Sequence, residues 1–187
     1  MPFETMRTFF ALAALAVNIA TIALLIIGLI GRKKDHSPFA FLEGTTMWLA
    51  GGIALASTLG SLYLSEIVHL IPCKFCWYQR IAMYPIALIL LLAAARKDAK
   101  ARLYAVSLAV IGAGIAGWHR LIQSYPSLES GSCAATGPPC SAPYIKEFGF
   151  VTIPYMALSA FLLIIVLMWA DRLNGDSARS IPPSDQA

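Results

Sequence analysis

The amino-acid sequence predicts an all-α membrane protein, a bundle of five transmembrane helices. The first observation is composition: 58% of the 187 residues are hydrophobic and 13% are charged, whereas a soluble domain is about half apolar and about a quarter charged. The second is distribution, because the apolar residues gather in five runs, at 9–30, 48–71, 81–95, 103–122 and 150–170. A helix of about 20 residues crosses the hydrocarbon layer of a bilayer. These observations exclude a soluble globular domain, a disordered chain and a fibrous repeat.

The first run is expected to stay in the protein as an extra N-terminal helix. Its apolar stretch of about 22 residues is longer than the roughly 7–15 residues of a signal peptide. Its basic cluster, Arg32–Lys34, follows the run, whereas a signal peptide carries such a cluster before it. We therefore assign residues 1–34 to this helix and its basic flank.

The remaining runs form a core that we assign to residues 48–170. The run at 81–95 is short for a span, and it reaches full length if its helix begins upstream, near Cys73 to Cys76. After the last run the chain is rich in Ser, Pro and Asp from Asn174 onward. We predict that residues 171–187 form a disordered cytoplasmic tail.

Basic residues predict the orientation in the membrane. Nine of the fourteen Lys and Arg residues fall in three segments that alternation of the helices places on one side: Arg32–Lys34, Arg96–Arg102, and the stretch with Arg172 and Arg179. Basic residues near helix ends favour the cytoplasmic side. The N-terminus is then expected outside and the C-terminal tail inside. The net charge of +4 is thus a topology signal and does not indicate a nucleic-acid partner.

The same topology places all four cysteines on the outer side. Cys73 and Cys76 lie between the second and third runs, and Cys133 and Cys140 lie in the long loop before the last run. Two close pairs of cysteines in an oxidising compartment are typical of disulfides. Two structural staples for exposed loops would give the same pattern.

The first pair has the features of a redox-active dithiol. Cys73 and Cys76 have C-x-x-C spacing, and Pro72 followed by a helical run puts Cys73 near a helix N-terminus. The free N–H groups and positive dipole end there favour a thiolate, the attacking species in thiol–disulfide exchange. Helical spacing puts Arg80 on the same face, about one turn inside the membrane, where a charge is costly. We interpret Arg80 as a cation that stabilises an anion, either the thiolate or a reduced cofactor; an arginine that merely snorkels to the surface is the alternative.

The second pair lies in a loop that cannot be helical, because Gly137, Pro138 and Pro139 stand between Cys133 and Cys140. A disulfide closing so short a loop is exposed, and exposed disulfides tend to be labile. A labile disulfide beside a fixed dithiol is the arrangement of an electron relay. Electrons would enter at the mobile pair and pass to the pair at the membrane edge.

Three stretches resemble the DsbB/BdbC family of disulfide-forming membrane oxidoreductases, in its short-loop, BdbC-like branch. Residues 72–85 (PCKFCWYQRIAMYP) are similar to the family signature, and their C-x-x-C-x-x-x-R motif between prolines is specific. Residues 118–126 resemble the helix leading into the second outer loop, and residues 146–154 resemble the return into the last helix. The resemblance covers residues 48–170 and implies a four-helix core, to which this chain adds the N-terminal helix.

The resemblance implies a quinone-dependent protein disulfide oxidoreductase of the bacterial plasma membrane, with its redox cysteines on the extracytoplasmic side. Its cofactor would be ubiquinone or menaquinone from the membrane quinone pool. Cys76 would contact the quinone, and Arg80, His119 and Gln123 would bind it. Its partner would be a thioredoxin-like thiol oxidase of the DsbA/BdbD type, which in turn oxidises secreted proteins.

The resemblance makes all four cysteines catalytic. Cys133 would form the mixed disulfide with the partner, and Cys140 would exchange with Cys73. Six residues separate Cys133 from Cys140, a much smaller gap than in the long form of the family, so which loop cysteine exchanges with Cys73 stays open. The extra N-terminal helix has no functional account at this point.

Other functions fit parts of the pattern. Four cysteines are enough ligands for a structural zinc site, although the second pair is loosely spaced for zinc. A disulfide-stapled transporter or channel component is a further alternative, but the helices offer almost no polar pathway. The vitamin K epoxide reductase type also couples a loop pair to a C-x-x-C, yet there the loop pair comes first in the chain. Without the resemblance, His119 is equally well an interfacial histidine.

Overall fold

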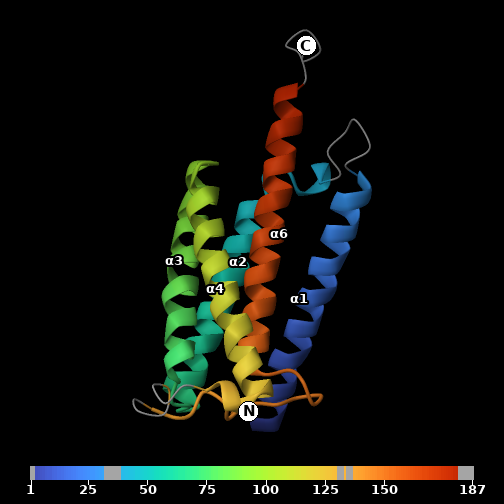
Figure 1. Ribbon diagram of the computed structural model, residues 1–187. Coiled ribbons are helices and arrows are strands. Elements are labelled where there is room, and N and C mark those ends of the chain that lie inside the picture. Colours follow the sequence, from blue (N-terminus) through green and yellow to red (C-terminus); the bar gives the residue numbers. More distant parts are fainter. Residues whose placement is uncertain (1–2, 32–38, 130–132, 134–136, 181–187) are drawn as a thin grey trace.

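The part of the chain that the structure describes contains five long helices, as the runs of apolar residues predict. The computed structural model describes residues 3–31, 39–129, 133 and 137–180. Its long helices are α1 (Phe3–Gly31), α2 (Thr46–Leu62), α3 (Lys74–Arg96), α4 (Ala101–Ser124) and α6 (Ile153–Ser180) (Figure 1). Each is long and apolar enough to cross a membrane, α2 together with the helical turn that continues it to Ile67. The prediction of an all-helical, multi-pass membrane protein is confirmed.

Helices α2, α3, α4 and α6 pack around a core rich in small side chains. Fully buried alanines stand along these helices at positions 50, 54, 105, 109 and 116. Small residues let helix backbones approach closely, which gives membrane helices their packing contacts. Gly112 of α4 faces the ring of Phe161 of α6 so closely that an added Cβ would overlap the ring. Helix α1 lies along the outside of this bundle, next to α6 (Figure 1).

The connection from α2 to α3 positions the first cysteine pair. Helix α2 ends in a π-helical turn, η2 (Tyr63–Ile67), in which the Val68 N–H donates to the Tyr63 carbonyl at 3.1 Å. His69 then has a φ of +59°, a left-handed conformation that turns the chain. Cys73 follows as the extended N-cap of α3, which begins at Lys74. The predicted upstream start of the third span is therefore confirmed.

The prediction of a disordered tail from residue 171 is wrong for its first part, because α6 continues to Ser180. Polar contacts hold the start of this extension. The carboxylate of Asp171 pairs with the Arg102 guanidinium at 3.1 Å and accepts a hydrogen bond from the Thr46 hydroxyl. The Asn174 amide donates to the Phe39 carbonyl at 3.1 Å, beside the short 3₁₀ helix η1 (Ala40–Leu42). The rest of the predicted tail, 181–187, lies outside the described residues.

The two ends of the bundle differ in chemistry. The turn between α3 and α4, with four basic side chains in residues 96–102, lies at the same end as the C-terminus of α6 (Figure 1). The opposite end carries the start of α1, the short 3₁₀ helix η3 (Pro126–Leu128) and the loop that leads into α6. All four cysteines lie at this second end, away from the basic turn.

Candidate functional site

The four cysteines come together in one buried cluster at the end of α3. The Cys73 and Cys76 sulfurs are 2.9 Å apart, one helical turn apart along the chain, and both residues are free cysteines. Cys133 and Cys140 form a disulfide with a Cα–Cα distance of 6.0 Å. Ile122 of α4 belongs to the same buried cluster. The two cysteine pairs that the sequence analysis placed on one side of the membrane are thus neighbours in the fold.

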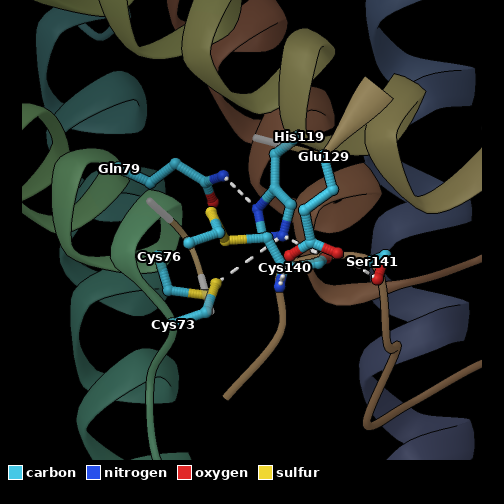
Figure 2. Close-up of a disulfide and its surroundings, with 8 residues drawn as sticks. Cys73, Cys76, Gln79, His119, Glu129, Cys140 and Ser141 are labelled. Carbon is cyan, nitrogen blue, oxygen red and sulfur yellow. Dashed lines mark hydrogen bonds between the residues drawn. A yellow bond between two sulfur atoms is a disulfide. The ribbon is translucent and has the colours of Figure 1, made fainter. Parts of the chain in front are cut away.

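The His119 ring contacts both pairs. Its Nε2 atom lies 3.6 Å from the Cys73 sulfur and 3.1 Å from the backbone carbonyl oxygen of Cys140. Figure 2 shows dashed lines from this ring to both cysteines and to Gln79. His119 is 1% exposed, so the ring bridges the dithiol and the disulfide without contact with bulk water.

Gln79 determines which ring nitrogen of His119 carries the proton. The Gln79 side-chain nitrogen lies 3.1 Å from Nδ1 of His119, and both side chains are buried. An amide N–H donating to Nδ1 leaves Nδ1 as the acceptor, so the proton of the neutral ring is on Nε2. The Nε2–H group then points at the Cys140 carbonyl and the Cys73 sulfur. It is the donor that a thiolate at Cys73 needs.

The surroundings of Cys73 favour its thiolate. The pKa of Cys73 is lowered from its ordinary value, first by the hydrogen bond from the Cys76 thiol and then by the hydrogen bond and electrostatic attraction of the His119 N–H group. Burial of the thiol opposes this shift but does not cancel it. Cys73 also caps the N-terminus of α3, where backbone N–H groups and the helix dipole stabilise negative charge. These surroundings therefore stabilise negative charge on the Cys73 sulfur.

A carboxylate anchors the loop disulfide. The Cys140 backbone N–H donates to Oε1 of Glu129 at 2.6 Å, and the Ser141 hydroxyl donates to the other oxygen of the same carboxylate (Figure 2). A carboxylate oxygen of Glu129 and the Cys133 and Cys140 sulfurs lie within 4.8 Å of one another. The loop pair therefore sits beside a negative charge, whereas Cys73 sits beside donors.

Arg80 points its guanidinium toward α2. Its Nε atom donates to the Ser61 hydroxyl and its terminal nitrogen to the Ser61 carbonyl, both at 2.9 Å, and the guanidinium carbon lies 5.3 Å from the centre of the Trp77 ring. Among the residues that the structure describes, no carboxylate pairs with Arg80. A cation without a counter-charge at membrane depth is costly unless a ligand supplies the anion.

A cavity of about 390 Å³ opens beside Cys76 and Arg80. Its walls come from α1, α2, α3 and α6 and are mainly apolar, with Cys76, Gln79, Arg80 and Tyr84 among the few polar side chains. The Tyr84 hydroxyl is buried and has no hydrogen-bond partner among the described residues. An apolar cavity of this size with a few convergent polar groups is typical of a small-molecule site.

The structure separates the predicted site residues into two groups. The four cysteines and His119 lie together, and Arg80 lines the cavity together with Cys76. His119 lies behind Gln79 and does not line the cavity. Gln123 is absent from the cavity lining too, and its side-chain oxygen is buried without a partner among the described residues. A quinone-binding role for His119 or Gln123 stays a prediction.

Three residues of the site were not predicted from the sequence: Gln79, Tyr84 and Glu129. Gln79 had a usable signal, since it stands one helical turn after Cys76 and so shares its face. Tyr84 stands one turn after Arg80 in the same way. Glu129 had no such signal, because no regular spacing links a loop carboxylate to a cysteine 11 positions later.

The first pair also has the donors of a metal site. The Cys73 and Cys76 sulfurs and a His119 ring nitrogen lie within 4.8 Å of one another. Thiolate and imidazole are the ligands that zinc prefers, although a structural zinc site takes four of them. A zinc site of all four cysteines, one of the alternatives that fit the sequence, does not agree with this structure, because Cys133 and Cys140 are joined to each other.

Comparisons with known proteins find similarity over most of the chain. The family model described as Disulfide bond formation protein DsbB matches residues 43–170. The chain is 49% identical over 116 residues to Disulfide bond formation protein C of Bacillus subtilis, covering 62% of this chain and 84% of that protein. It is 44% identical over 136 residues to Probable disulfide formation protein C of Bacillus cereus, covering 73% and 93%. It is likewise 44% identical over 119 residues to Probable disulfide formation protein C of Halalkalibacterium halodurans, covering 64% and 85%. No solved structure gives a significant match.

Proposed function

Because the chain belongs to the DsbB family of disulfide bond formation proteins, we propose that it is a membrane oxidoreductase that reoxidises a thioredoxin-like extracytoplasmic partner and passes the electrons to a membrane quinone. The partner in turn would oxidise secreted proteins. One observation carries the proposal: the His119 ring contacts both cysteine pairs, while Cys76 of the inner pair lines an apolar cavity. The cysteine cluster lies away from the basic turn between α3 and α4, which supports an extracytoplasmic position for it.

The relay begins at the loop disulfide. A thiolate of the partner attacks the Cys133 sulfur, which forms a mixed disulfide and releases Cys140 as a thiolate. The second thiol of the partner then attacks the partner's own sulfur in the mixed disulfide. This step releases Cys133 as a thiolate and leaves the partner with its disulfide. Cys133 and Cys140 now hold the two electrons as a dithiol, with protons taken from water.

The second step moves the electrons to the inner pair. The Cys140 thiolate attacks Cys73 in a Cys73–Cys76 disulfide and releases Cys76. Cys133 then attacks Cys140, re-forms the loop disulfide and releases Cys73. A thiol of low pKa leaves faster, so the lowered pKa of Cys73 favours this release. The His119 Nε2–H donates to the sulfur as it becomes negative. The products are the loop disulfide and the two free thiols of the present structure.

In the third step, the two electrons of the inner pair pass to an acceptor in the membrane. A bound quinone would supply the acceptor for two electrons and two protons. Cys76, Arg80 and Tyr84 are the residues that would hold it, since all three line the cavity. The guanidinium of Arg80, which pairs with no described carboxylate, stabilises negative charge beside Cys76, and the Tyr84 hydroxyl offers a hydrogen bond that no described residue accepts. The apolar walls keep water from the thiols. Ubiquinone and menaquinone both fit this chemistry.

The proposal is tested by anaerobic mixing of the purified, pre-reduced protein with a soluble quinone while the quinone absorbance is followed. We expect the wild type to reduce one equivalent of quinone per inner dithiol. The Cys76→Ser variant should reduce none, and Arg80→Ala should be slower by about 100-fold, as for loss of a donor to a developing anion. A wild type that transfers no electrons to the quinone would refute the proposal.

A structural zinc site at the inner pair is the second candidate, because Cys73, Cys76 and His119 form a set of three close donors. The same preparation decides between the two. One tightly bound zinc per chain, together with no quinone reduction, would favour the metal site. Quinone reduction by a preparation with no more than trace zinc would exclude it.

A further inference from the structure

Helix α1 precedes the region that the family model matches, which begins at residue 43. The sequence alone gives this helix no functional account, and a membrane anchor would need no specific contact with the core. In the structure α1 instead takes part in the cavity beside Cys76 and Arg80. A role for α1 in ligand binding there rests on the proposed quinone-linked function.

One face of α1 forms a side of the cavity. Phe9, Phe10, Ala13, Ala14 and Val17 all line it. These positions follow helical spacing, so they make one continuous stripe over two turns. Across the cavity stand Cys76 and Arg80, the residues that the relay uses. The same cavity therefore has redox and charged groups on its α3 side and two aromatic rings on its α1 side.

Specific contacts fix α1 in this position. At mid-helix the Asn18 amide donates to the Tyr155 hydroxyl at 3.1 Å and to the Ser159 hydroxyl at 3.0 Å, both on α6. Polar side chains that bond across membrane helices hold them in register. At the outer end, the Arg7 guanidinium pairs with the Glu147 carboxylate at 2.7 Å. These contacts bind α1 to α6 and to the loop before it on either side of the cavity-lining stripe.

Close packing against α2 completes the wall. A Cβ added to Gly60 of α2 would lie 3.1 Å from the ring of Phe10, tighter than ordinary contact. The missing side chain at Gly60 thus lets the Phe10 ring approach the α2 backbone. Ser61, the residue that holds Arg80, follows directly. Phe10 of α1 and Arg80 of α3 therefore contact adjacent residues of α2 and lie at the same level of the bundle.

We propose that α1 is a wall of the quinone site, with Phe9, Phe10 and Ala13 determining how tightly the quinone fits between α1 and α3. Two observations carry this: the continuous stripe of α1 residues in the cavity lining, and the polar contacts that hold α1 there. The aromatic rings offer an apolar face to a flat ring. The small side chain of Ala13 leaves the space that the ligand takes.

The test compares two substitutions of the same kind on α1. Ala13→Phe fills the cavity from its α1 side. Ala16→Phe is the matched control, because Ala16 is also an exposed alanine, one turn further along, and does not line the cavity. Each full-length protein, with both cysteine pairs oxidised so that no turnover occurs, is titrated with a short-chain water-soluble quinone by equilibrium dialysis in lipid nanodiscs.

We expect Ala13→Phe to weaken quinone binding by about tenfold or more, as overpacking of a fitted site does, and Ala16→Phe to leave it within about twofold. If the wild type binds and reduces quinone but the two variants bind equally, α1 is not part of the site and the inference is overturned. If the wild type itself neither binds nor reduces quinone, the proposed function fails instead.

A second variant keeps the test decisive if Ala13→Phe does not fold. Phe10→Ala removes a ring from the wall without inserting anything, and we expect it to weaken quinone binding by about fivefold or more, as for loss of a buried aromatic contact. Folding is checked by the Cys133–Cys140 disulfide and the thermal midpoint. A folded Phe10→Ala protein with wild-type affinity would also overturn the inference.

Discussion

The side-chain nitrogen of Gln79 lies 3.1 Å from Nδ1 of His119, and this contact joins α3 to α4 at the point where the two cysteine pairs meet. The bond fixes the proton of the neutral ring on Nε2. That atom faces Cys73 and the Cys140 carbonyl. Gln79 touches neither sulfur in the described contacts, so it acts by positioning the ring.

Replacing Gln79 with leucine should slow electron transfer between the two pairs. Without the amide donor the ring can place its proton on either nitrogen, and the Nε2–H donor to Cys73 is lost part of the time. We expect the transfer rate to fall by about tenfold, the effect of about 1.4 kcal/mol in the barrier. The measurement is a single-turnover experiment in which a reduced loop pair is generated and the thiols of each pair are trapped by alkylation.

Gln123→Leu is the matched control for this change. Gln123 lies on α4 one turn from His119 and is partly buried, but no described contact joins it to either cysteine pair. Its variant should transfer electrons at the wild-type rate. Equal slowing in both variants would mean that the Gln79 effect is one of helix packing and not of ring orientation.

The pH dependence of the inner pair should reveal the lowered pKa of Cys73. If Cys73 stays a thiolate after reduction, the Cys73–Cys76 couple takes up one proton with its two electrons. Its potential should then fall by about 30 mV per pH unit near neutrality, and by about twice that if both thiols are protonated. Redox equilibration against a dithiol buffer at pH 6, 7 and 8, read by alkylation, measures the slope. A slope near 60 mV in the wild type would contradict a thiolate at Cys73.

His119→Leu should move this slope and the potential together. The variant loses the hydrogen bond and electrostatic attraction of the His119 N–H group that lower the Cys73 pKa, although the larger contribution from the Cys76 thiol remains. The thiolate is then less favoured, so the potential of the inner pair should fall. In the reduced wild type, the lowered pKa also adds folding stability that is present above the ordinary thiol pKa and is lost as the pH falls through the folded-state value. The variant should show less of this stability at pH 9.

Most of the fold could be predicted from the sequence because membrane helices carry a strong signal. Runs of about 20 apolar residues have few alternatives in a bilayer, and each of the five runs corresponds to one long helix. The end of α6 could not be predicted, because its continuation past residue 170 depends on Asp171 and Asn174 meeting Arg102 and Phe39. Such contacts join residues far apart in the chain, so they cannot be predicted from the composition of the tail.

The site was predictable where local spacing carries the chemistry. The C-x-x-C and Arg80 follow from helical geometry alone. The place of His119 did not follow, since whether it faces the cavity or the disulfide depends on how α4 is rotated against α3. The position of α1 in the cavity wall could not be predicted either. In the sequence, Phe9, Phe10 and Ala13 are ordinary apolar residues of a membrane helix, and their place in the lining depends on how α2 and α6 pack beside α1.

Tyr84→Phe should weaken quinone binding without weakening the fold. The Tyr84 hydroxyl is buried and unpartnered among the described residues, so its removal costs the protein no internal hydrogen bond. A lost hydrogen bond of about 1 kcal/mol to the ligand corresponds to roughly fivefold weaker binding. Tyr104→Phe is the control, since Tyr104 is 65% exposed on α4. A destabilised Tyr84→Phe protein with unchanged quinone affinity would show that the hydroxyl has a structural partner instead.

The two cysteine pairs differ in the electrostatic character of their surroundings. Cys73 lies at a helix N-terminus beside the Nε2–H of His119, and both favour negative sulfur. The loop pair lies beside the Glu129 carboxylate, which disfavours negative charge on Cys133 and Cys140. Negative charge on sulfur is therefore better stabilised at the inner pair, which agrees with the proposed transfer of electrons from the loop pair to the inner pair.

Glu129→Gln should make the loop disulfide easier to reduce by small anionic thiols. Attack brings a thiolate close to the carboxylate and releases another, so a repulsion of about 1 kcal/mol is relieved and the rate should rise roughly fivefold. Ser141→Ala leaves the carboxylate in place and removes one of its two hydrogen bonds, so its rate should stay within about twofold of the wild type. The measurement is the pseudo-first-order loss of the Cys133–Cys140 disulfide in excess glutathione, read by alkylation. If both variants accelerate equally, Glu129 acts by anchoring the loop and not by its charge. If neither does, the carboxylate has no part in protecting the disulfide from thiols other than those of its partner.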